Sequence, residues 1–372
     1  MQVAIVHDWL TGMRGGERVL EILCEIFPKA HIYTLLYIKG NLSNIIESKK
    51  ISTTFIQLLP FVKKYYEYYL PLYPIAIEGI QLNRYDLVIS SSHCVAKGVV
   101  SPPGSCSICY CHTPMRYVWD RYYDYFLANS ESKGFFKYIV KFFSHYLRMW
   151  DITSSSRVDH FVANSKYVAN RIEKFYRRAS DVIYPPVDCN RFYISDKVED
   201  YYLIVSALRP YKRIDIAIEA FNELGYPLKI IGTGKHDIQL KKIAKSNIEF
   251  LGYVYDEEIS HYFSRCRGLI FPGIEDFGIV PLEVQASGRP VIAYGAGGTI
   301  ESVKEGETGT FFYEQTKDDL KAAVLRFQKM KFEPEKIRKY AFKFEKEVFR
   351  DKFEKFVFEK FEDYNKGLNP KR

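Results

Sequence analysis

Residues 201–225, YYLIVSALRPYKRIDIAIEAFNELG, contain the pattern that decides the fold. The apolar run at their start is typical of a buried strand, and the residues after Arg213 place apolar side chains at helical spacing. Gly225 stands where a glycine commonly ends a helix. A strand, a short basic loop and a helix in this order indicate a parallel sheet covered by helices.

The same alternation runs along the whole chain. In the first half, apolar runs predict strands at residues 3–7, 32–36, 87–90, 107–111, 160–163 and 182–184, and residues 19–27 have helical spacing. In the second half, further strands are expected within residues 228–234, 247–254, 267–273 and 290–294.

Pro185 and Pro186 interrupt regular structure between the two halves. We therefore expect an N-terminal Rossmann-like domain at residues 1–188 and a C-terminal Rossmann-like domain at residues 189–340. Residues 341–372 are expected to form C-terminal helices, for which packing back on the N-terminal domain is one arrangement.

The composition is that of a globular protein. Of the 372 residues, 47% are hydrophobic and 26% are charged, and the formal net charge is +8. These values argue against long disordered segments and fit two domains. No apolar run approaches the length of a transmembrane helix, and the chain begins directly with a strand-like run rather than a signal peptide. We therefore predict a cytoplasmic protein, on its own or peripheral on the inner face of a membrane.

Cys106, Cys109, Cys111 and His112 at first suggest a metal site. They lie in SCSICYCHTP, which alternates like a buried strand, so Cys106 and Cys109 should point to opposite faces. A zinc site needs a loop that gathers its ligands. We therefore favour buried free thiols, which also suit a reducing compartment, and predict no metal site.

The most specific segment is GIEDFGIVPLEVQASGRPVIAYGAGGTIESV, residues 273–303. Pro281 suits a helix start and Gly288 its end, which predicts Glu283 in the first turn and Glu275 in the preceding loop. A loop and helix start of this kind can hold an anion, and carboxylates can accept hydrogen bonds from sugar hydroxyls. Taken alone, the pair is better explained as a helix cap and a solvated acidic loop.

Arg209 and Lys212 follow a predicted strand at the end where open α/β sheets bind ligands. Cations at a helix start are poorly placed unless an anion binds there, and a departing pyrophosphate is such an anion. The alternative is a pair of exposed basic residues.

Two further segments of the first half carry candidate residues. VHDWLTGMRGGERVL, residues 6–20, is a glycine-rich loop before a helix, without the Gly-x-Gly-x-x-Gly spacing of dinucleotide-binding proteins. His112 in YCHTPMRYVWD follows a strand, where a lone histidine is more often structural, and SSSHCVAKGV adds His93 and Lys97.

These segments together resemble the family 4 retaining glycosyltransferases of the GT-B fold, in which two Rossmann-like domains face each other across a cleft. The resemblance is most specific in EDFGIVPLEVQASGRPVIA, which fits the Glu-x7-Glu motif of that family and continues through Gly295, Gly297 and Gly298. With VANSKYVANRI and IYPPVD it extends over nearly the whole chain. It is greatest to bacterial mannosyltransferase-like enzymes of surface-polysaccharide assembly.

The resemblance implies roles for the C-terminal half, which would bind the donor. Glu275 would contact the donor sugar, and Glu283 the ribose of the nucleotide. The segment of Asp276, Phe277, Gly278 and Ile279 would face the sugar and pyrophosphate. The backbone of Gly252, Tyr253 and Val254 is assigned to the base.

The leaving group would be stabilised by Lys212 together with Arg209. The family usually has an arginine just after a serine or glycine, where this chain has Ala207. Either Arg209 substitutes for that arginine, or Lys212 acts with less help. In the N-terminal half, the resemblance brings Gly15 and Gly16 close to the donor phosphates and sugar, and His112 beside the sugar. His93 and Lys97 are assigned to the acceptor side.

The implied activity is transfer of a hexose, with mannose from GDP-mannose favoured, to a lipid-linked or growing glycan. The sugar nucleotide is a substrate, and no cofactor is expected. Because the sequence has no Asp-x-Asp pair, we expect transfer without a metal ion. The alternatives are a UDP-sugar donor, a GT-B nucleotide-sugar epimerase, or a protein that binds a nucleotide sugar without catalysis.

Two stretches combine aromatic and basic residues: residues 61–74, FVKKYYEYYLPLYP, and residues 133–150, KGFFKYIVKFFSHYLRMW. The second contains Lys133, Lys137, Lys141 and Arg148 and no acidic residue. This pattern suits an anionic membrane surface, and it equally suits a helix that packs its aromatic residues into a core. Stacking on nucleic acid would need an accompanying RNA-binding motif, so we predict no nucleic-acid partner.

Overall fold

The computed structural model of the chain describes residues 1–120 and 135–368. Two compact units are present: residues 1–185 together with 349–372 form unit 1, and residues 186–348 form unit 2. The units therefore divide between Pro185 and Pro186, and the chain returns to unit 1 after Val348. Among the described residues, no helix combines the length and apolar character needed to cross a bilayer.

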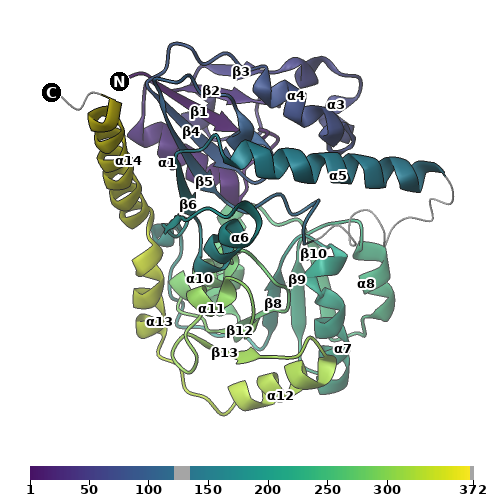
Figure 1. Cartoon of the computed structure of the whole chain (residues 1–372). Helices are drawn as coiled ribbons and strands as arrows, with labels where there is room; N and C mark the ends of the chain where they lie inside the picture. Colours follow the sequence, from purple (N-terminus) through teal and green to yellow (C-terminus); the bar gives the residue numbers. More distant parts are fainter. Residues whose placement is uncertain (121–134, 369–372) are drawn as a thin grey trace. The chain divides into compact units, whose positions relative to one another are not determined.

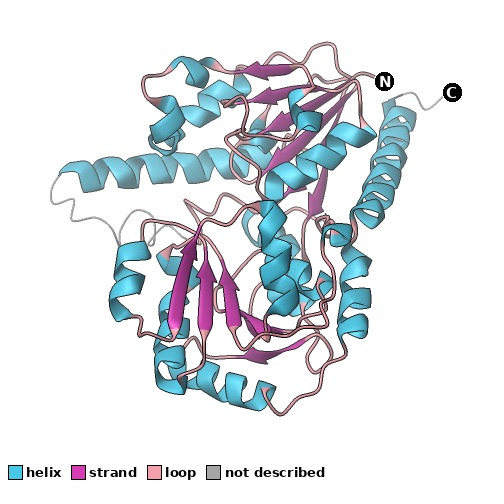
Figure 2. Ribbon diagram, turned by 180° about the vertical axis from the view of Figure 1, so that it is seen from behind, coloured by secondary structure: helices cyan, strands magenta, loops and turns pink. Residues whose placement is uncertain are grey.

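Unit 1 contains a seven-stranded sheet in the order β3-β2-β1-β4-β5-β6-β7, in which every neighbouring pair is parallel (Figures 1 and 2). The chain moves outward from β1 to β3 and then starts again from β4 on the other side of β1. The strands are β1 (Val3–His7), β2 (His31–Thr34), β3 (Ile51–Thr53), β4 (Leu87–Ser92), β5 (Cys106–Cys111), β6 (His160–Ala163) and β7 (Asp181–Val182).

Helices cover both faces of this sheet. One apolar face, which includes Ile5, packs against α1 and α14, and the other, which includes Val6, packs against α4 and α5. The helices are α1 (Gly15–Ile26), α2 (Asn44–Glu47), α3 (Val62–Tyr65), α4 (Tyr73–Glu78), α5 (Phe135–Ser155), α6 (Lys166–Tyr176) and α14 (Lys346–Leu368), with 3-10 turns η1 (Phe55–Leu58), η2 (Tyr66–Leu72) and η3 (Ala96–Gly98).

The C-terminal helix α14 is part of the core of unit 1. Phe349 and Phe353 are buried, and their rings lie 5.6 and 5.9 Å from the ring of Tyr110 in β5. Phe358 contacts Phe27 at the end of α1, beside which α14 runs in Figure 1. Burial of Phe349 and Phe353 stabilises this docking by several kcal/mol, since each fully buried side chain contributes about 1.5–3 kcal/mol.

Unit 2 contains a six-stranded parallel sheet in the order β10-β9-β8-β11-β12-β13. Its strands are β8 (Tyr202–Val205), β9 (Leu228–Ile231), β10 (Ile248–Gly252), β11 (Gly268–Phe271), β12 (Val291–Tyr294) and β13 (Gly309–Phe312). Its helices are α7 (Ile214–Leu224), α8 (Asp237–Ile243), α9 (Asp256–Arg265), α10 (Ile279–Ala286), α11 (Thr299–Ser302), α12 (Lys317–Phe327) and α13 (Pro334–Ala341), with 3-10 turns η5 (Cys189–Arg191), η6 (Pro210–Lys212) and η7 (Phe342–Phe344).

The α/β prediction with two parallel sheets is confirmed. Both sheets have the doubly wound order in which the first and fourth strands are neighbours at the centre. Two strands were not predicted, β3 and β13, and β2 begins and ends earlier than expected. The segment after residue 332 forms α13, η7 and α14.

The cysteine-rich segment forms β5, as predicted. Cys106 packs in the core beside α1, whereas Cys109 and Cys111 pack on the opposite face against α6. All seven cysteines are buried and free. Within the described ranges, His, Cys, Asp and Glu side chains form no group of three arranged to hold a metal ion.

Candidate functional site

In unit 2, the candidate residues lie at the carboxyl ends of β8 and β11. These two strands are neighbours at the point where the strand order reverses, and ligands of doubly wound sheets bind at such a point. Lys212 ends the 3-10 turn η6 after β8, and Glu275 lies in the loop after β11. The sequence separates them by more than sixty positions, and the fold brings them together.

Lys212 and Glu275 form an ion pair in which the Lys212 Nζ donates a hydrogen bond to Glu275 Oε1. Each side chain is 18% exposed, so the pair is accessible to a ligand and yet partly shielded from water. A partly buried cation attracts an anion more strongly than one in bulk water. The pair thus holds an ammonium group, fixed in position, at the end of β8.

Glycines hold the Glu275 loop against its neighbours. Gly297 is in the left-handed region with φ +74°, and a β-carbon there would lie 2.5 Å from the carbonyl oxygen of Glu275. The Gly298 N–H donates to the same carbonyl at 2.8 Å. On the other side, a β-carbon at Gly273 would lie 3.1 Å from the backbone of Lys212. The loops after β8, β11 and β12 therefore pack backbone to backbone.

Helix α10 starts directly after this loop, and its first N–H groups are those of Ile279 and Val280. Gly278 precedes it with φ +90°, a conformation that glycine adopts without strain. Asp276 and Phe277 occupy the short connection from Glu275, and the ring of Phe277 is buried. Free N–H groups and the helix dipole make this position suitable for an anion.

Glu283 is not in the first turn of α10, so that prediction was wrong. The helix begins at Ile279, which places Glu283 in its second turn, because Pro281 is the third residue of the helix and not the first. Side chains on a helix point toward its N-terminus, so the half-buried carboxylate of Glu283 is directed toward the same end as Gly278.

The remaining candidates of unit 2 lie around the same edge of the sheet. Arg209 is half-buried and precedes η6, where its carbonyl accepts from the Lys212 N–H. Gly252 ends β10 with φ +69°, and its carbonyl accepts from the Gly232 N–H at 2.7 Å. The following Tyr253 is exposed and packs edge-on against Tyr255, and Val254 is half-buried between them in sequence.

In unit 1, the candidate residues gather at the corresponding reversal point, between β1 and β4. Asp8 follows β1 and is fully buried. Its carboxylate accepts four backbone N–H groups, those of residues 93–96 after β4, at 2.6–3.0 Å. Burial alone would raise the pKa of Asp8, but the His93 imidazole and these donors outweigh burial and lower it. Asp8 therefore anchors the loop that carries His93.

Three histidines meet beside this anchor. His93 Nδ1 lies 3.1 Å from Asp8 Oδ2, and its ring packs edge-on against Trp9. Ser91 Oγ joins the other two rings, because it lies 3.1 Å from His7 Nδ1 and 2.8 Å from His112 Nε2.

Gly15 and Gly16 are the first two residues of α1, which begins next to the histidines. A β-carbon at Gly16 would lie 3.6 Å from the His7 ring and 3.7 Å from His112 Nε2, so the backbone of the helix start contacts both rings. Glu17, the next residue, is buried and accepts from the Arg14 N–H at 3.0 Å.

Burial, together with the neighbouring His93 and His7 rings, lowers the pKa of His112 to about 3. Burial also lowers the pKa of His93, although Asp8 opposes the effect. His112 is therefore a neutral imidazole at neutral pH, and it can donate or accept a hydrogen bond without carrying a charge.

Lys97 does not lie on a surface where an acceptor would meet it. Its side chain is 2% exposed, and its Nζ contacts Asp151 Oδ1 at 3.0 Å and Ser154 Oγ at 2.6 Å in α5. The Trp150 and Tyr176 rings flank the ammonium. The charge of Lys97 is thus compensated inside unit 1, which indicates a structural role.

Four further polar residues belong to the histidine cluster and were not predicted from the sequence: His7, Asp8, Glu17 and Ser91. His7 is the last residue of β1 and Ser91 the last but one of β4, and both strands have the pattern of buried runs. Asp8 and Glu17 lie in the glycine-rich segment, where the glycines are the evident feature. A run of polar residues at the carboxyl end of a predicted parallel strand could have indicated them, because ligands bind at that end.

Comparison with known proteins gave matches over most of the chain. The family model described as "Glycosyltransferase Family 4" matches residues 13–191, and the model described as "Glycosyl transferases group 1" matches residues 191–344.

Each of the following curated relatives matches this chain over only part of the relative's own length. An uncharacterised glycosyltransferase of Methanocaldococcus jannaschii is 30% identical over 46% of this chain and 50% of its own. The O-antigen chain mannosyltransferase C of Escherichia coli is 32% identical over 32% and 31%. The mouse alpha-1,3/1,6-mannosyltransferase ALG2 is 24% identical over 65% and 64%. The chain thus spans from about a third to about two thirds of the length of these relatives.

Solved structures match the fold nearly end to end. The Anabaena protein HepE, in complex with UDP and glucose, has a TM-score of 0.70 at 15% identity, over 96% of this chain and 99% of that one. A sucrose-phosphate synthase from Thermosynechococcus elongatus has a TM-score of 0.72 at 15% identity, over 98% and 100%.

Proposed function

The chain belongs to the group 1 and family 4 glycosyltransferases of the GT-B fold, and from this premise we propose that it is an enzyme that transfers a sugar from a nucleotide sugar. The proposed reaction moves a hexose, with mannose from GDP-mannose favoured, to a lipid-linked or growing glycan, with retention of configuration. In this proposal unit 1 is the acceptor domain and unit 2 binds the donor.

The observation that carries the proposal is the Lys212–Glu275 pair at the reversal point of unit 2, next to the start of α10. An ammonium group and free helix N–H groups together suit a diphosphate. A carboxylate beside them suits the hydroxyl groups of a sugar, which donate hydrogen bonds to it. The three groups match the parts of a nucleotide sugar.

Each group then has a role in the reaction. Lys212, aided by Arg209, would stabilise the negative charge that develops as the nucleoside diphosphate departs. Glu275 and the Asp276–Ile279 backbone would hold the sugar and phosphates, and Glu283 would accept from the ribose hydroxyls. The acceptor oxygen forms a bond to the anomeric carbon on the face that the diphosphate leaves, and the departing phosphate oxygen takes the acceptor proton.

In unit 1, the neutral His112 supports a hydrogen-bonding role toward sugar hydroxyls and not that of a charged acid. Gly15 and Gly16 offer the N–H groups of the α1 start, which suit phosphate or sugar oxygens. His93, which Asp8 orients, is the better candidate of the two residues assigned to the acceptor.

Mannose is favoured because two of the relatives above are named as mannosyltransferases, one of them for O-antigen chains. The neighbour crystallised with UDP and glucose supports the alternative of a UDP-sugar donor. The Lys212–Glu275 pair and the glycine-packed Glu275 loop weigh against a binding protein that has lost catalysis. An epimerase would need its own pair of acid and base carboxylates.

We also propose a peripheral location on the cytoplasmic side of a membrane, and residues on the surface of unit 1 support contact with a membrane. Helix α5 buries Leu147 and Trp150, yet it exposes Tyr138 by 69% and Phe142 by 67%. Residues 58–68 also expose large apolar side chains, including Leu58 at 84%, and Lys63 and Lys64 lie between them. Aromatic and basic side chains exposed together suit an anionic lipid surface. Lys133, and the side chain of Lys137, lie outside the described part of the chain.

The test is a panel of donors, GDP-mannose, UDP-glucose, UDP-galactose and ADP-glucose, with a polyprenyl-diphosphate-linked acceptor in vesicles. We expect one donor to be converted to its nucleoside diphosphate and a glycolipid, with full activity in EDTA, because Lys212 and Arg209 serve where a metal ion would. Absence of transfer from every donor contradicts the enzyme proposal, and a strict requirement for manganese or magnesium contradicts the metal-independent mechanism.

A further inference from the structure

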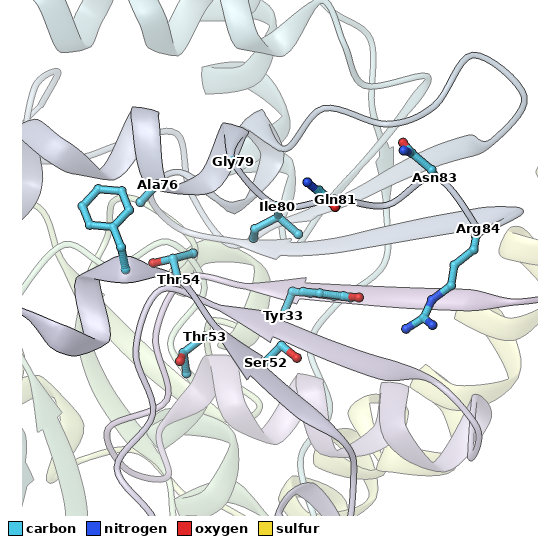
Figure 3. Close-up of a pocket in the computed structure, with 11 residues that line it drawn as sticks. Tyr33, Ser52, Thr53, Thr54, Ala76, Gly79, Ile80, Gln81, Asn83 and Arg84 are labelled. Atoms are coloured by element: carbon cyan, nitrogen blue, oxygen red, sulfur yellow. The ribbon is translucent and has the colours of Figure 1, made fainter.

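A pocket of about 610 Å³ lies in unit 1 at the edge of the sheet, away from the residues assigned so far. Its walls come from β2, the end of β3, α4 and the loop that leads to β4 (Figure 3). None of the lining residues belongs to the histidine cluster. The volume is within the range of small-molecule sites, about 300–1,000 Å³.

A hydrogen-bond network centred on the buried residues His31 and Tyr85 connects several residues of the pocket lining. His31, which is 7% exposed, has Nδ1 2.9 Å from the Tyr85 hydroxyl and Nε2 2.9 Å from Ser52 Oγ. Arg84 Nη2 lies 3.1 Å from the Tyr85 hydroxyl, and the Tyr33 hydroxyl lies 3.0 Å from it. The network therefore joins three lining residues, Tyr33, Ser52 and Arg84, through two residues that do not line the pocket.

Arg84 sets the direction of two hydrogen bonds in this network, because a guanidinium group only donates. Its Nη2 donates to the Tyr85 oxygen and also lies 3.3 Å from His31 Nδ1, which therefore accepts. His31 then carries its proton on Nε2 and donates to Ser52 Oγ. Burial, with the charges of Lys50 and Arg84, lowers the pKa of His31 to about 4, which agrees with a neutral ring.

Two lining groups follow with a defined polarity. Ser52 accepts from His31, so its hydroxyl proton is available to donate into the pocket. The hydrogen bond between the Tyr33 and Tyr85 hydroxyls can run in either direction, and in both cases the Tyr33 oxygen keeps a lone pair that can accept. A ligand hydroxyl, which both donates and accepts, fits this donor and acceptor.

The rim adds the same kind of chemistry. Thr53 contributes a hydroxyl beside Ser52, whereas the Thr54 hydroxyl donates to the Leu35 carbonyl at 3.1 Å. Gln81 and Asn83 contribute amides on the opposite side, as Figure 3 shows. Phe55, 45% exposed, contributes an apolar ring to the lining. Among the described residues that line the pocket, Arg84 is the one that carries a charge, and none has a carboxylate.

We propose that this pocket binds a saccharide, as a second site that holds a part of the glycan other than the reacting sugar. The hydroxyl and amide groups of the lining can donate to and accept from the hydroxyls of a sugar, and the exposed aromatic ring can pack against the apolar face of the sugar. A nucleotide or a phosphate would call for more than one cation, and an apolar ligand would leave the network unmatched. The binding stands without the proposed activity, whereas a role in holding a growing glycan rests on that activity.

The experiment measures saccharide binding to the full chain by calorimetry and by ligand-observed NMR. The probes are α-linked mannotriose and a disaccharide that contains glucuronic acid, whose carboxylate would favour Arg84. The variants are Tyr33→Phe, which removes the accepting oxygen, and Phe55→Ala, which removes the apolar ring. We expect each to weaken binding of the probe about fivefold or more, the effect of about 1 kcal/mol.

Matched controls are Tyr138→Phe and Phe142→Ala, the same changes at exposed positions of α5 outside the pocket. The controls should bind the saccharide as the unaltered chain does. Lys212→Ala should also keep saccharide binding, so that loss of transfer and loss of this site are separate results. Binding of neither probe overturns the proposal, as does equal binding by the pocket variants and their controls.

Discussion

At the scale of single residues, the charge of Lys212 is expected to act on turnover. The Lys212→Ala variant should lower kcat by about 100-fold, as the loss of one group that stabilises developing negative charge does. Lys212→Arg, which keeps the charge, should recover part of the activity. Initial rates at saturating donor measure this, with the thermal midpoint as a check on folding.

The Arg209→Ala variant tests which of the two cations, Lys212 or Arg209, stabilises the leaving group. Arg209 is close in sequence but has no ion pair with Glu275 among the described contacts, so the smaller loss is expected from this variant. Normal turnover by Lys212→Ala, together with a large loss in Arg209→Ala, would show that the leaving group relies on the arginine.

The sequence predicted which side chains follow the strands, but not which contacts each of them makes in the folded chain. Glu275 and Lys212 stand at strand ends in the sequence, and their pairing required the fold. Lys97 also follows a strand closely, but its ion pair with Asp151, which is distant in the sequence, holds its side chain in the interior. Asp8 was missed because a carboxylate that accepts four backbone N–H groups has no sequence pattern of its own.

At the scale of elements, the packing of Gly297 under the Glu275 loop is expected to control donor binding. In Gly297→Ala the added β-carbon would lie 2.5 Å from the Glu275 carbonyl oxygen, so the loop must move. We expect the affinity for the nucleoside diphosphate, measured by calorimetry, to fall about tenfold or more, because displaced donors lose charge-assisted hydrogen bonds of about 1.5–3 kcal/mol.

Gly306→Ala is the matched control for this prediction. Gly306 has φ +75°, close to the +74° of Gly297, but a β-carbon there meets nothing within 4 Å. Both variants should lose stability from the left-handed conformation, roughly 1–2 kcal/mol, and only Gly297→Ala should lose affinity. Equal affinities in the two variants would mean that the loop position does not matter to the donor.

Elements with a strong apolar pattern were predicted, and weak ones were not. The helix at α7 was predicted from its spacing and its terminal Gly225, and it ends there with Gly225 at φ +72°. Strand β3 has three residues, Ile-Ser-Thr, and β13 starts at a glycine, so neither contains an apolar run long enough to predict a strand. Pairing with β2 and β12 makes them strands.

At the scale of the whole molecule, the net charge of +8 and the aromatic surface of unit 1 predict salt-sensitive binding to anionic vesicles. Each basic residue near such a surface contributes about 1 kcal/mol. Reversing the charge of Lys63 and Lys141 together, as Lys63→Glu and Lys141→Glu, should therefore weaken co-sedimentation at least about tenfold. High salt should release the unaltered chain.

The matched control reverses two lysines elsewhere on unit 1, as Lys352→Glu and Lys355→Glu in α14, where both side chains are exposed. This change gives the same net charge. If the surface around Lys63 and Lys141 is what contacts the membrane, the control should lose less vesicle binding. If both double variants lose binding equally, net charge alone drives attachment, and if neutral vesicles bind as well as anionic ones, the basic residues have no part in it.

The place of α14 in unit 1 also has a consequence for synthesis on the ribosome. Every strand of unit 1 has been translated by residue 182, but Phe349 and Phe353 are added only after the whole of unit 2. Unit 2 is one continuous stretch and can complete its core first, while the nascent unit 1 still exposes the apolar surface around Tyr110. A premature stop codon just after residue 348 would leave the second half of the protein whole and the first half prone to aggregation.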